Sequence, residues 1–99
     1  MKNIIVKSER DNVGNALEAV EQGDEVAWSR GGLPGRTTAL DKVPFGFKMA
    51  LEQLPAGADV IGYGEVIGMA LRDIRPGELV HIHNMAGKRG NPAAPGSRA

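Results

Sequence analysis

The chain has 99 residues, 41% of them hydrophobic, and its twelve acidic residues balance twelve basic ones. This length fits one small domain, and the balanced charge gives no strong field that would favour nucleic acid, a membrane surface or a polyanion. The absence of cysteine excludes disulfide bonds and thiolate metal sites, so a metal ion here would need nitrogen and oxygen ligands.

Glycine and proline are abundant, with fourteen and six residues respectively. Both residue types mark turns, so a β-rich fold is favoured over a helical bundle. The apolar run at residues 4–6 is too short for a signal peptide, and no later stretch could span a bilayer. A cytoplasmic protein is therefore expected.

The first part of the chain predicts a strand followed by a helix. Residues 2–7 contain three consecutive β-branched side chains, which favour a strand. A helix over residues 11–22 is then indicated, because apolar side chains recur at helical spacing after Asp11, a favourable N-cap, and Gly23 provides a stop. Capping alone is the simpler interpretation of Asp11. The alternative is that Asp11 and Asn12 lie at an exposed helix start that also attracts anions.

The middle of the chain predicts strands, a hairpin and a second short helix. Residues 25–30 alternate like a strand, and the glycine-rich cluster at 31–35 reads as a hairpin connection. Residues 48–54 can form a short helix with its apolar side chains turned inward. No internal repeat is evident. The remaining strands of this region are expected at residues 36–40, 59–63 and 65–71.

Residues 79–84, with the sequence Leu-Val-His-Ile-His-Asn, contain both histidines of the chain. As a β-strand, this segment would place His81 and His83 on one face and two aliphatic side chains on the other. The folded domain is expected to cover residues 1–85. Residues 86–99 have no acidic residue and no apolar periodicity, which predicts a disordered tail.

The two histidines are the first candidates for chemistry. Imidazoles ligate transition metals and carry protons near neutral pH, and two of them at alternate strand positions can chelate one ion. A catalytic metal usually has three or more protein ligands, and the segment holds neither a third histidine nor a carboxylate. Spacing alone therefore favours ordinary half-exposed sheet residues. Asn84 adds an amide that can donate and accept hydrogen bonds.

Two further side chains could bind a substrate. Lys48 follows a glycine-containing bend and could hold a carboxylate, although most such lysines are simply solvated. Tyr63 could use its hydroxyl, although a half-buried tyrosine in a sheet is the commoner explanation. No serine or threonine has a histidine nearby in the sequence, so nothing resembles a nucleophilic triad.

A series of short motifs, taken in order and spacing, points to one family. The motifs are Asp-Asn-Val at 11–13, Pro-Phe-Gly-Phe-Lys-Met-Ala-Leu at 44–51, Val-Ile-Gly-Tyr-Gly at 60–64, Ile-Gly-Met-Ala at 67–70, Asp-Ile at 73–74, Gly-Glu at 77–78 and His-Ile-His-Asn at 81–84. This series resembles the small N-terminal domain of the altronate/galactarate dehydratase family. That module is also found as the separate small subunit of sulfolactate sulfo-lyases, and it is classed with the SAF domains.

The resemblance implies a mainly β structure with one or two short helices, of the SAF β-clip type. It also implies a small subunit of a metal-dependent lyase that removes water or sulfite from a sugar acid or related hydroxy acid, such as altronate, galactarate or sulfolactate. The divalent metal is expected to be iron(II), shared with a large subunit that holds most of the active site. The resemblance leaves the oligomeric state open, a homo-oligomer included.

The match also suggests roles for individual residues. The reaction needs a base that removes a proton next to a carboxylate, together with acid or metal assistance for the leaving group. His81 and His83 would be metal ligands or acid–base groups, and Asn84 would orient the substrate. Further substrate contacts would come from Lys48, Asp11, Asn12 and Tyr63.

One position departs from the family pattern. The family commonly has Gly-His-Lys at the bend where this chain has Gly46-Phe47-Lys48, and phenylalanine can neither ligate a metal nor transfer a proton. If that histidine is needed for dehydration, this chain acts on another substrate, uses another group or is not catalytic. The alternatives to a lyase subunit are a non-catalytic SAF binding module, which recognises a carbohydrate acid or a protein partner, and a purely scaffolding domain.

Overall fold

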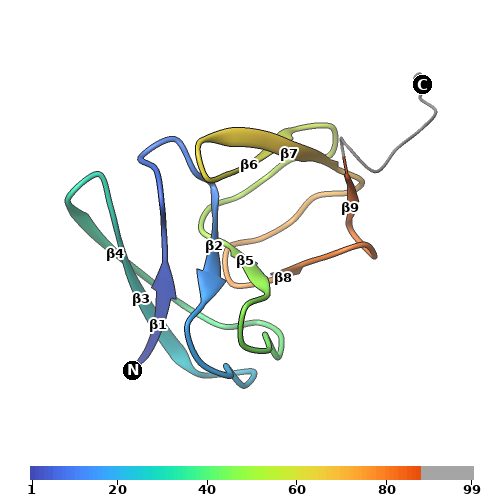
Figure 1. Ribbon diagram of the computed structural model, residues 1–99. Helices are drawn as coiled ribbons and strands as arrows, with labels where there is room; N and C mark the ends of the chain where they lie inside the picture. Colours follow the sequence, from blue (N-terminus) through green and yellow to red (C-terminus); the bar gives the residue numbers. More distant parts are fainter. Residues whose placement is uncertain (88–99) are drawn as a thin grey trace.

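Short strands joined by tight turns make up residues 1–87, the part of the chain that the computed structural model describes (Figure 1). No helix occurs in this part, and so none that is long and apolar enough to cross a membrane. The strands are β1 (Lys2–Ile5), β2 (Val13–Ala16), β3 (Glu25–Arg30), β4 (Leu33–Thr38), β5 (Lys48–Ala50), β6 (Asp59–Gly62), β7 (Glu65–Ala70), β8 (Leu79–Val80) and β9 (Met85–Gly87).

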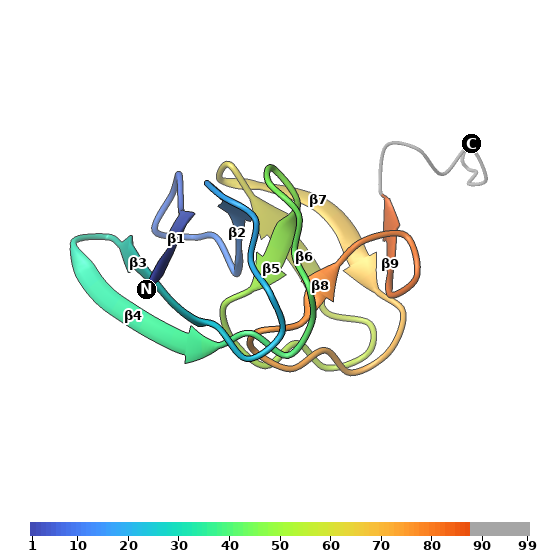
Figure 2. The same ribbon diagram turned by 90° about the horizontal axis from the view of Figure 1, so that it is seen from below.

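The strands form two sheets. One sheet has six strands in the order β4-β3-β1-β2-β5-β8, and the other has three in the order β6-β7-β9. The β1–β3 pair is parallel, and the other named pairs are antiparallel. The β3–β4 hairpin and β9 lie at opposite ends of the molecule (Figure 2). The prediction of a mainly β fold is therefore confirmed.

Both predicted helices are wrong. Residues 11–22 contain β2 and a loop, and residues 48–54 contain β5 and a loop. The strands predicted at residues 2–7, 25–30, 59–63 and 65–71 are present with small shifts of their ends. Ala86 and Gly87, which the sequence assigned to the tail, belong to β9, and the rest of that segment lies outside the described residues.

An eleven-residue motif occurs four times, so the expectation of no internal repeat is wrong. Its pattern is Ala-Leu, two variable residues, an aliphatic residue, two variable residues, glycine, two variable residues and a final apolar residue. Each copy is a loop that runs from the end of one strand into the start of the next. The four copies occupy residues 16–26, 39–49, 50–60 and 70–80.

Backbone hydrogen bonds join the four copies into two pairs. Val20 bridges Val43 in the first pair, and Leu54 bridges Ile74 in the second. In every copy the glycine N–H donates to the alanine carbonyl of the paired copy, at 2.8 or 2.9 Å. Residues 16–49 and 50–80 are therefore two halves of similar construction, each with a hairpin between its two copies (β3–β4 and β6–β7).

The core follows this division. Each half has its own cluster of buried residues, and in every copy the alanine, the central aliphatic residue and the final apolar residue belong to it. Strand β5 joins the halves, because Met49 belongs to the first cluster and the adjacent Ala50 to the second. Burial of these positions is what fixes the irregular loops in place.

Candidate functional site

The segment with both histidines is a turn rather than a strand. Strand β8 ends at Val80, and residues 81–84 (the histidine loop) leave the sheet. His81 and His83 are exposed, and Ile82 between them is 79% exposed instead of facing the core. The predicted strand over residues 79–84 is therefore wrong beyond Val80, together with the alternation that placed both imidazoles on one sheet face.

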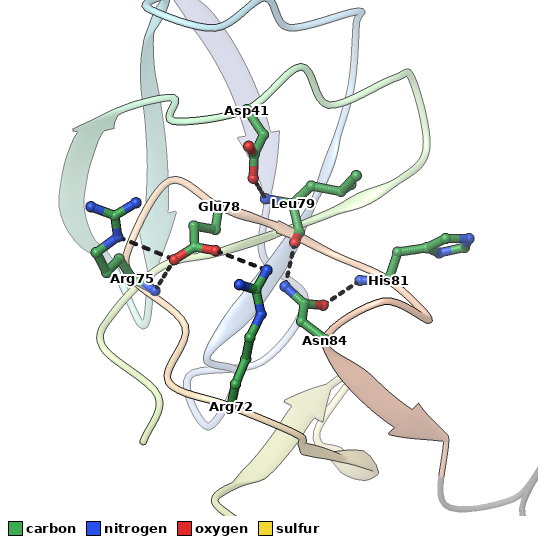
Figure 3. A network of polar contacts seen from close by, with 7 residues as sticks. All are labelled: Asp41, Arg72, Arg75, Glu78, Leu79, His81 and Asn84. Carbon is green, nitrogen blue, oxygen red and sulfur yellow. Dashed lines mark hydrogen bonds and ion pairs between the residues drawn. The ribbon is translucent and has the colours of Figure 1, made fainter. Parts of the chain in front are cut away.

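Asn84 explains why the chain turns here. Its side chain is completely buried, its Oδ1 accepts the N–H of His81 at 2.9 Å, and its Nδ2 donates to the carbonyl of Leu79 at 2.8 Å (Figure 3). The imidazole of His81 points away from this network. Both ends of the amide are bonded to the loop backbone. Asn84 therefore fixes the position of the loop through its backbone and not through the imidazole rings.

Two carboxylates that the sequence reasoning missed hold the chain just before the loop, one at the start of β8 and one in the turn that precedes it. Asp41 accepts the N–H of Leu79 at 2.9 Å. Glu78, which is nearly buried, accepts the N–H and Nε of Arg75 at 2.8 and 3.2 Å and lies 3.8 Å from Arg72 (Figure 3). A signal for Glu78 was its place beside the turn glycine, where an acceptor for nearby N–H groups is useful.

The start of β5 lies directly beside the histidine loop. Lys48 is the register partner of Val80, and the ring centroids of Phe47 and His81 are 5.0 Å apart with a 47° tilt. Within residues 1–87, the ammonium group of Lys48 has no hydrogen-bond or ion-pair partner. The structure thus places Phe47 against His81 and the unpaired Lys48 beside the start of the histidine loop, on which His83 is also exposed.

A metal would find an incomplete ligand set on this chain. Residues 1–87 contain no group of three or more histidine, cysteine, aspartate or glutamate side chains arranged to hold an ion. His81 and His83 offer two imidazole donors from one exposed loop. Divalent transition metals in enzymes usually take three protein ligands or more, so these residues do not form such a site by themselves.

Asp11 is a buried anchor rather than a helix cap. Its carboxylate accepts two N–H groups from the preceding loop and two from the turn between β6 and β7. The four donors and their distances are Lys7 at 3.2 Å, Ser8 at 3.0 Å, Tyr63 at 3.2 Å and Gly64 at 2.8 Å. Four donors satisfy the buried charge, and the contacts tie the β1–β2 loop to the β6–β7 hairpin.

Asn12 continues the same connection along β6. Its Nδ2 donates to the carbonyl of Asp59 at 2.9 Å, and its Oδ1 accepts the N–H of Ile61 at 2.7 Å. The predicted site residues therefore fall into two groups. His81, His83, Asn84 and Lys48 gather at β5 and β8, whereas Asp11, Asn12 and Tyr63 gather at the β6–β7 hairpin. Lys48 links the groups, because its Cε lies 4.0 Å from the position that a Cβ on Gly62 would take.

Comparison with known proteins identifies the class of this domain. Residues 2–88 match the family described as the altronate/galactarate dehydratase SAF domain. The chain belongs to this family. Its all-strand, two-sheet structure is consistent with the SAF β-clip.

Relatives of this SAF domain include both long enzymes and small subunits. This chain is 43% identical to altronate dehydratase of Escherichia coli (strain K12). The match covers 75% of this chain and 14% of that enzyme. The chain is 46% identical over 54% of its length to the (2R)-sulfolactate sulfo-lyase subunit alpha of Paracoccus pantotrophus, of which it spans 81%. The corresponding subunit of Chromohalobacter salexigens is 43% identical over 50% of the chain, which spans 52% of that subunit.

Proposed function

We propose that this SAF domain is the small component of a lyase that removes water, or sulfite, from a hydroxy acid, and that it acts with a large subunit. Membership of the altronate/galactarate dehydratase SAF family carries this proposal. Two relatives that are no longer than this chain are named as a subunit of a sulfo-lyase, and another relative is a dehydratase about five times as long. Altronate, galactarate and sulfolactate are accordingly the first substrates to test.

The histidine loop and Lys48 are the residues assigned to the chemistry. Elimination next to a carboxylate needs a base for the α-proton and an acid for the leaving group, and imidazole serves either purpose near neutral pH. The exposed imidazoles of His81 and His83 can reach a substrate held by another subunit, and the unpaired ammonium of Lys48 can bind the carboxylate of that substrate. Asn84 keeps the loop in this position through its two backbone contacts.

We also propose a divalent metal, iron(II), at the boundary between the two subunits. Nitrogen donors suit such an ion, and His81 and His83 would supply two of them while the large subunit completes the set. A bound divalent ion would lower the charge on the substrate carboxylate and assist departure of the leaving group. Within this chain, the loop backbone held by Asn84 sets the direction of both imidazoles.

The test combines the SAF domain with the large subunit from the same organism, under anaerobic conditions with iron(II), on the three acids named above. Elimination is expected only when both proteins are present. His81→Ala and His83→Ala should each lower kcat about a hundredfold, the contribution of a positioned acid or base. Leu33→Ala, at the exposed start of β4 in the distant hairpin, is the matched control and should leave kcat unchanged. A mixture that eliminates from none of the acids would contradict the proposal.

The contact between Phe47 and His81 favours a second candidate, a non-catalytic module that binds a carbohydrate acid or a protein partner. Phenylalanine removes a proton carrier from the site and adds an apolar surface. In that case His81→Ala and His83→Ala would leave partner or ligand affinity unchanged. A ligand that binds the folded domain at a hundredfold excess over its Kd should stabilise it by about 2.7 kcal/mol, and a thermal melt would detect this.

A further inference from the structure

The two halves of the domain contain hairpins whose turns have the same backbone but different residues. Gly31 and Gly32 connect β3 to β4 with φ values of 58° and 81°, and Tyr63 and Gly64 connect β6 to β7 with 54° and 77°. Positive φ at both central residues defines a type I′ turn, for which glycine or asparagine is preferred. The first hairpin has the preferred residue, and the second has tyrosine.

Tyr63 therefore has a strained backbone conformation, although its side chain is not part of the hydrophobic core. It is the one non-glycine residue with positive φ among residues 1–87, and this conformation is a marked outlier for a bulky side chain. The residue is 55% exposed, and its hydroxyl has no hydrogen-bond partner within the described part of the chain. The fold would accept a small residue at this position, so the ring itself needs an explanation outside this domain.

The surroundings hold the strained turn rigidly. The N–H groups of Tyr63 and Gly64 converge on the buried carboxylate of Asp11, at 3.2 and 2.8 Å. Consecutive N–H groups in a left-handed turn form a concave anion site, and here the anion is a side chain of the same molecule. Arg10 donates to the carbonyl of Gly64 at 3.0 Å and closes the turn from the other side. A rigid, exposed aromatic ring loses little entropy when it is buried by a partner.

We propose that Tyr63 is an anchor by which this SAF domain binds the large subunit, and that Asp11 is the positioning residue that holds the anchor in its left-handed turn. The inference rests on the proposed function, because it needs a large subunit to bind. Two relatives are named as subunits, and a third contains a similar segment within a longer chain. These relatives are the reason for choosing the large subunit as the binding partner. The hairpin would then be a second contact region, separate from the histidine loop.

The test measures both the Tm of the domain and its Kd for the large subunit by isothermal titration calorimetry. Tyr63→Asn, which suits a left-handed turn, should leave the Tm unchanged or raise it by about 4 °C. The same variant should weaken binding at least tenfold, as expected for a lost aromatic anchor. Leu33→Asn is the matched control, because Leu33 is 73% exposed at the tip of the equivalent hairpin; it should bind like the wild type.

Asp11 is tested in both backgrounds. Asp11→Asn should weaken binding when Tyr63 is present and add no further weakening when Tyr63→Asn is already in place. Equal affinity of Tyr63→Asn and wild type, or a fall in kcat with unchanged Kd, would overturn the anchor role. Equal weakening by Asp11→Asn in both backgrounds would overturn the positioning role. If the wild-type domain binds no large subunit, the proposed function fails together with the anchor role. If the wild type binds and Tyr63→Asn binds equally well, only the anchor role fails.

Discussion

Asn84 fixes the place of the histidine loop more firmly than either histidine does. Its replacement by alanine would remove both backbone contacts and leave the N–H of His81 and the carbonyl of Leu79 without their partner. Because the side chain is completely buried, Asn84→Ala should lower the free energy of unfolding by about 3 kcal/mol, measured by urea denaturation. Asn3→Ala, on an exposed position of β1, is the control and should change it by less than about 0.5 kcal/mol. Similar costs for the two variants would contradict this role.

Phe47 offers a second test at the scale of single residues. Phe47→His would place a third imidazole next to His81, at the 5.0 Å centroid separation that the two rings already have. We expect the isolated variant to bind Zn²⁺ at least tenfold more tightly than the wild type, because chelation by neighbouring imidazoles strengthens metal binding. Isothermal titration calorimetry measures this affinity, with Phe47→Leu as the apolar control. Equal affinities of Phe47→His and Phe47→Leu would show that the two positions do not share an ion.

At the scale of elements, the wrong helices have a definite physical cause. In each copy of the loop motif, an alanine and an aliphatic residue lie four positions apart and both are buried, as on one face of a helix. The structure buries them by a different route, with a bridge at the aliphatic residue and a turn at the glycine. Periodicity therefore identified most of the buried positions, with Leu17 at 50% exposure as an exception, and predicted the wrong backbone. Only the fourfold recurrence of the motif could have corrected it.

The glycines of the motif give a prediction with an internal control. Gly57 and Gly77 occupy the same position in paired copies, with φ of 88° and 93°. A Cβ on Gly57 would meet no atom within 4 Å, whereas one on Gly77 would collide with the carbonyl oxygen of Thr38. Gly57→Ala should cost about 1 kcal/mol from the left-handed backbone alone, and Gly77→Ala more than about 3 kcal/mol. Chemical denaturation measures both, and equal costs would contradict the structure.

At the scale of the whole molecule, the sequence predicted the fold class and family better than the site. Turn residues and β-branched runs identify a strand-rich chain, and the ordered motifs identify the SAF family that the comparisons show. Val80 and Ile82 alternate with the histidines, and this alternation predicts a strand where the structure has the histidine loop. That alternation carries no information about the side chain of Asn84, which bonds to the backbone of His81 and Leu79, three and five residues earlier, and so turns the chain out of the strand.

The two-cluster core makes a final prediction about the energetics of the whole domain. Val20 and Val43 face each other across the bridge of the first half, and Ile74 lies in the cluster of the second. Val20→Ala and Val43→Ala should each cost about 2 kcal/mol, and the double variant should depart from their sum by at least about 0.5 kcal/mol because the two side chains share one site. Val20→Ala and Ile74→Val should instead add within about 0.5 kcal/mol. Urea denaturation measures the free energies of unfolding for both cycles. Because β5 joins the two clusters, we expect the domain to unfold as one cooperative unit and the m-value to stay unchanged. A coupling across the halves as large as that within one half would show that the core is not divided.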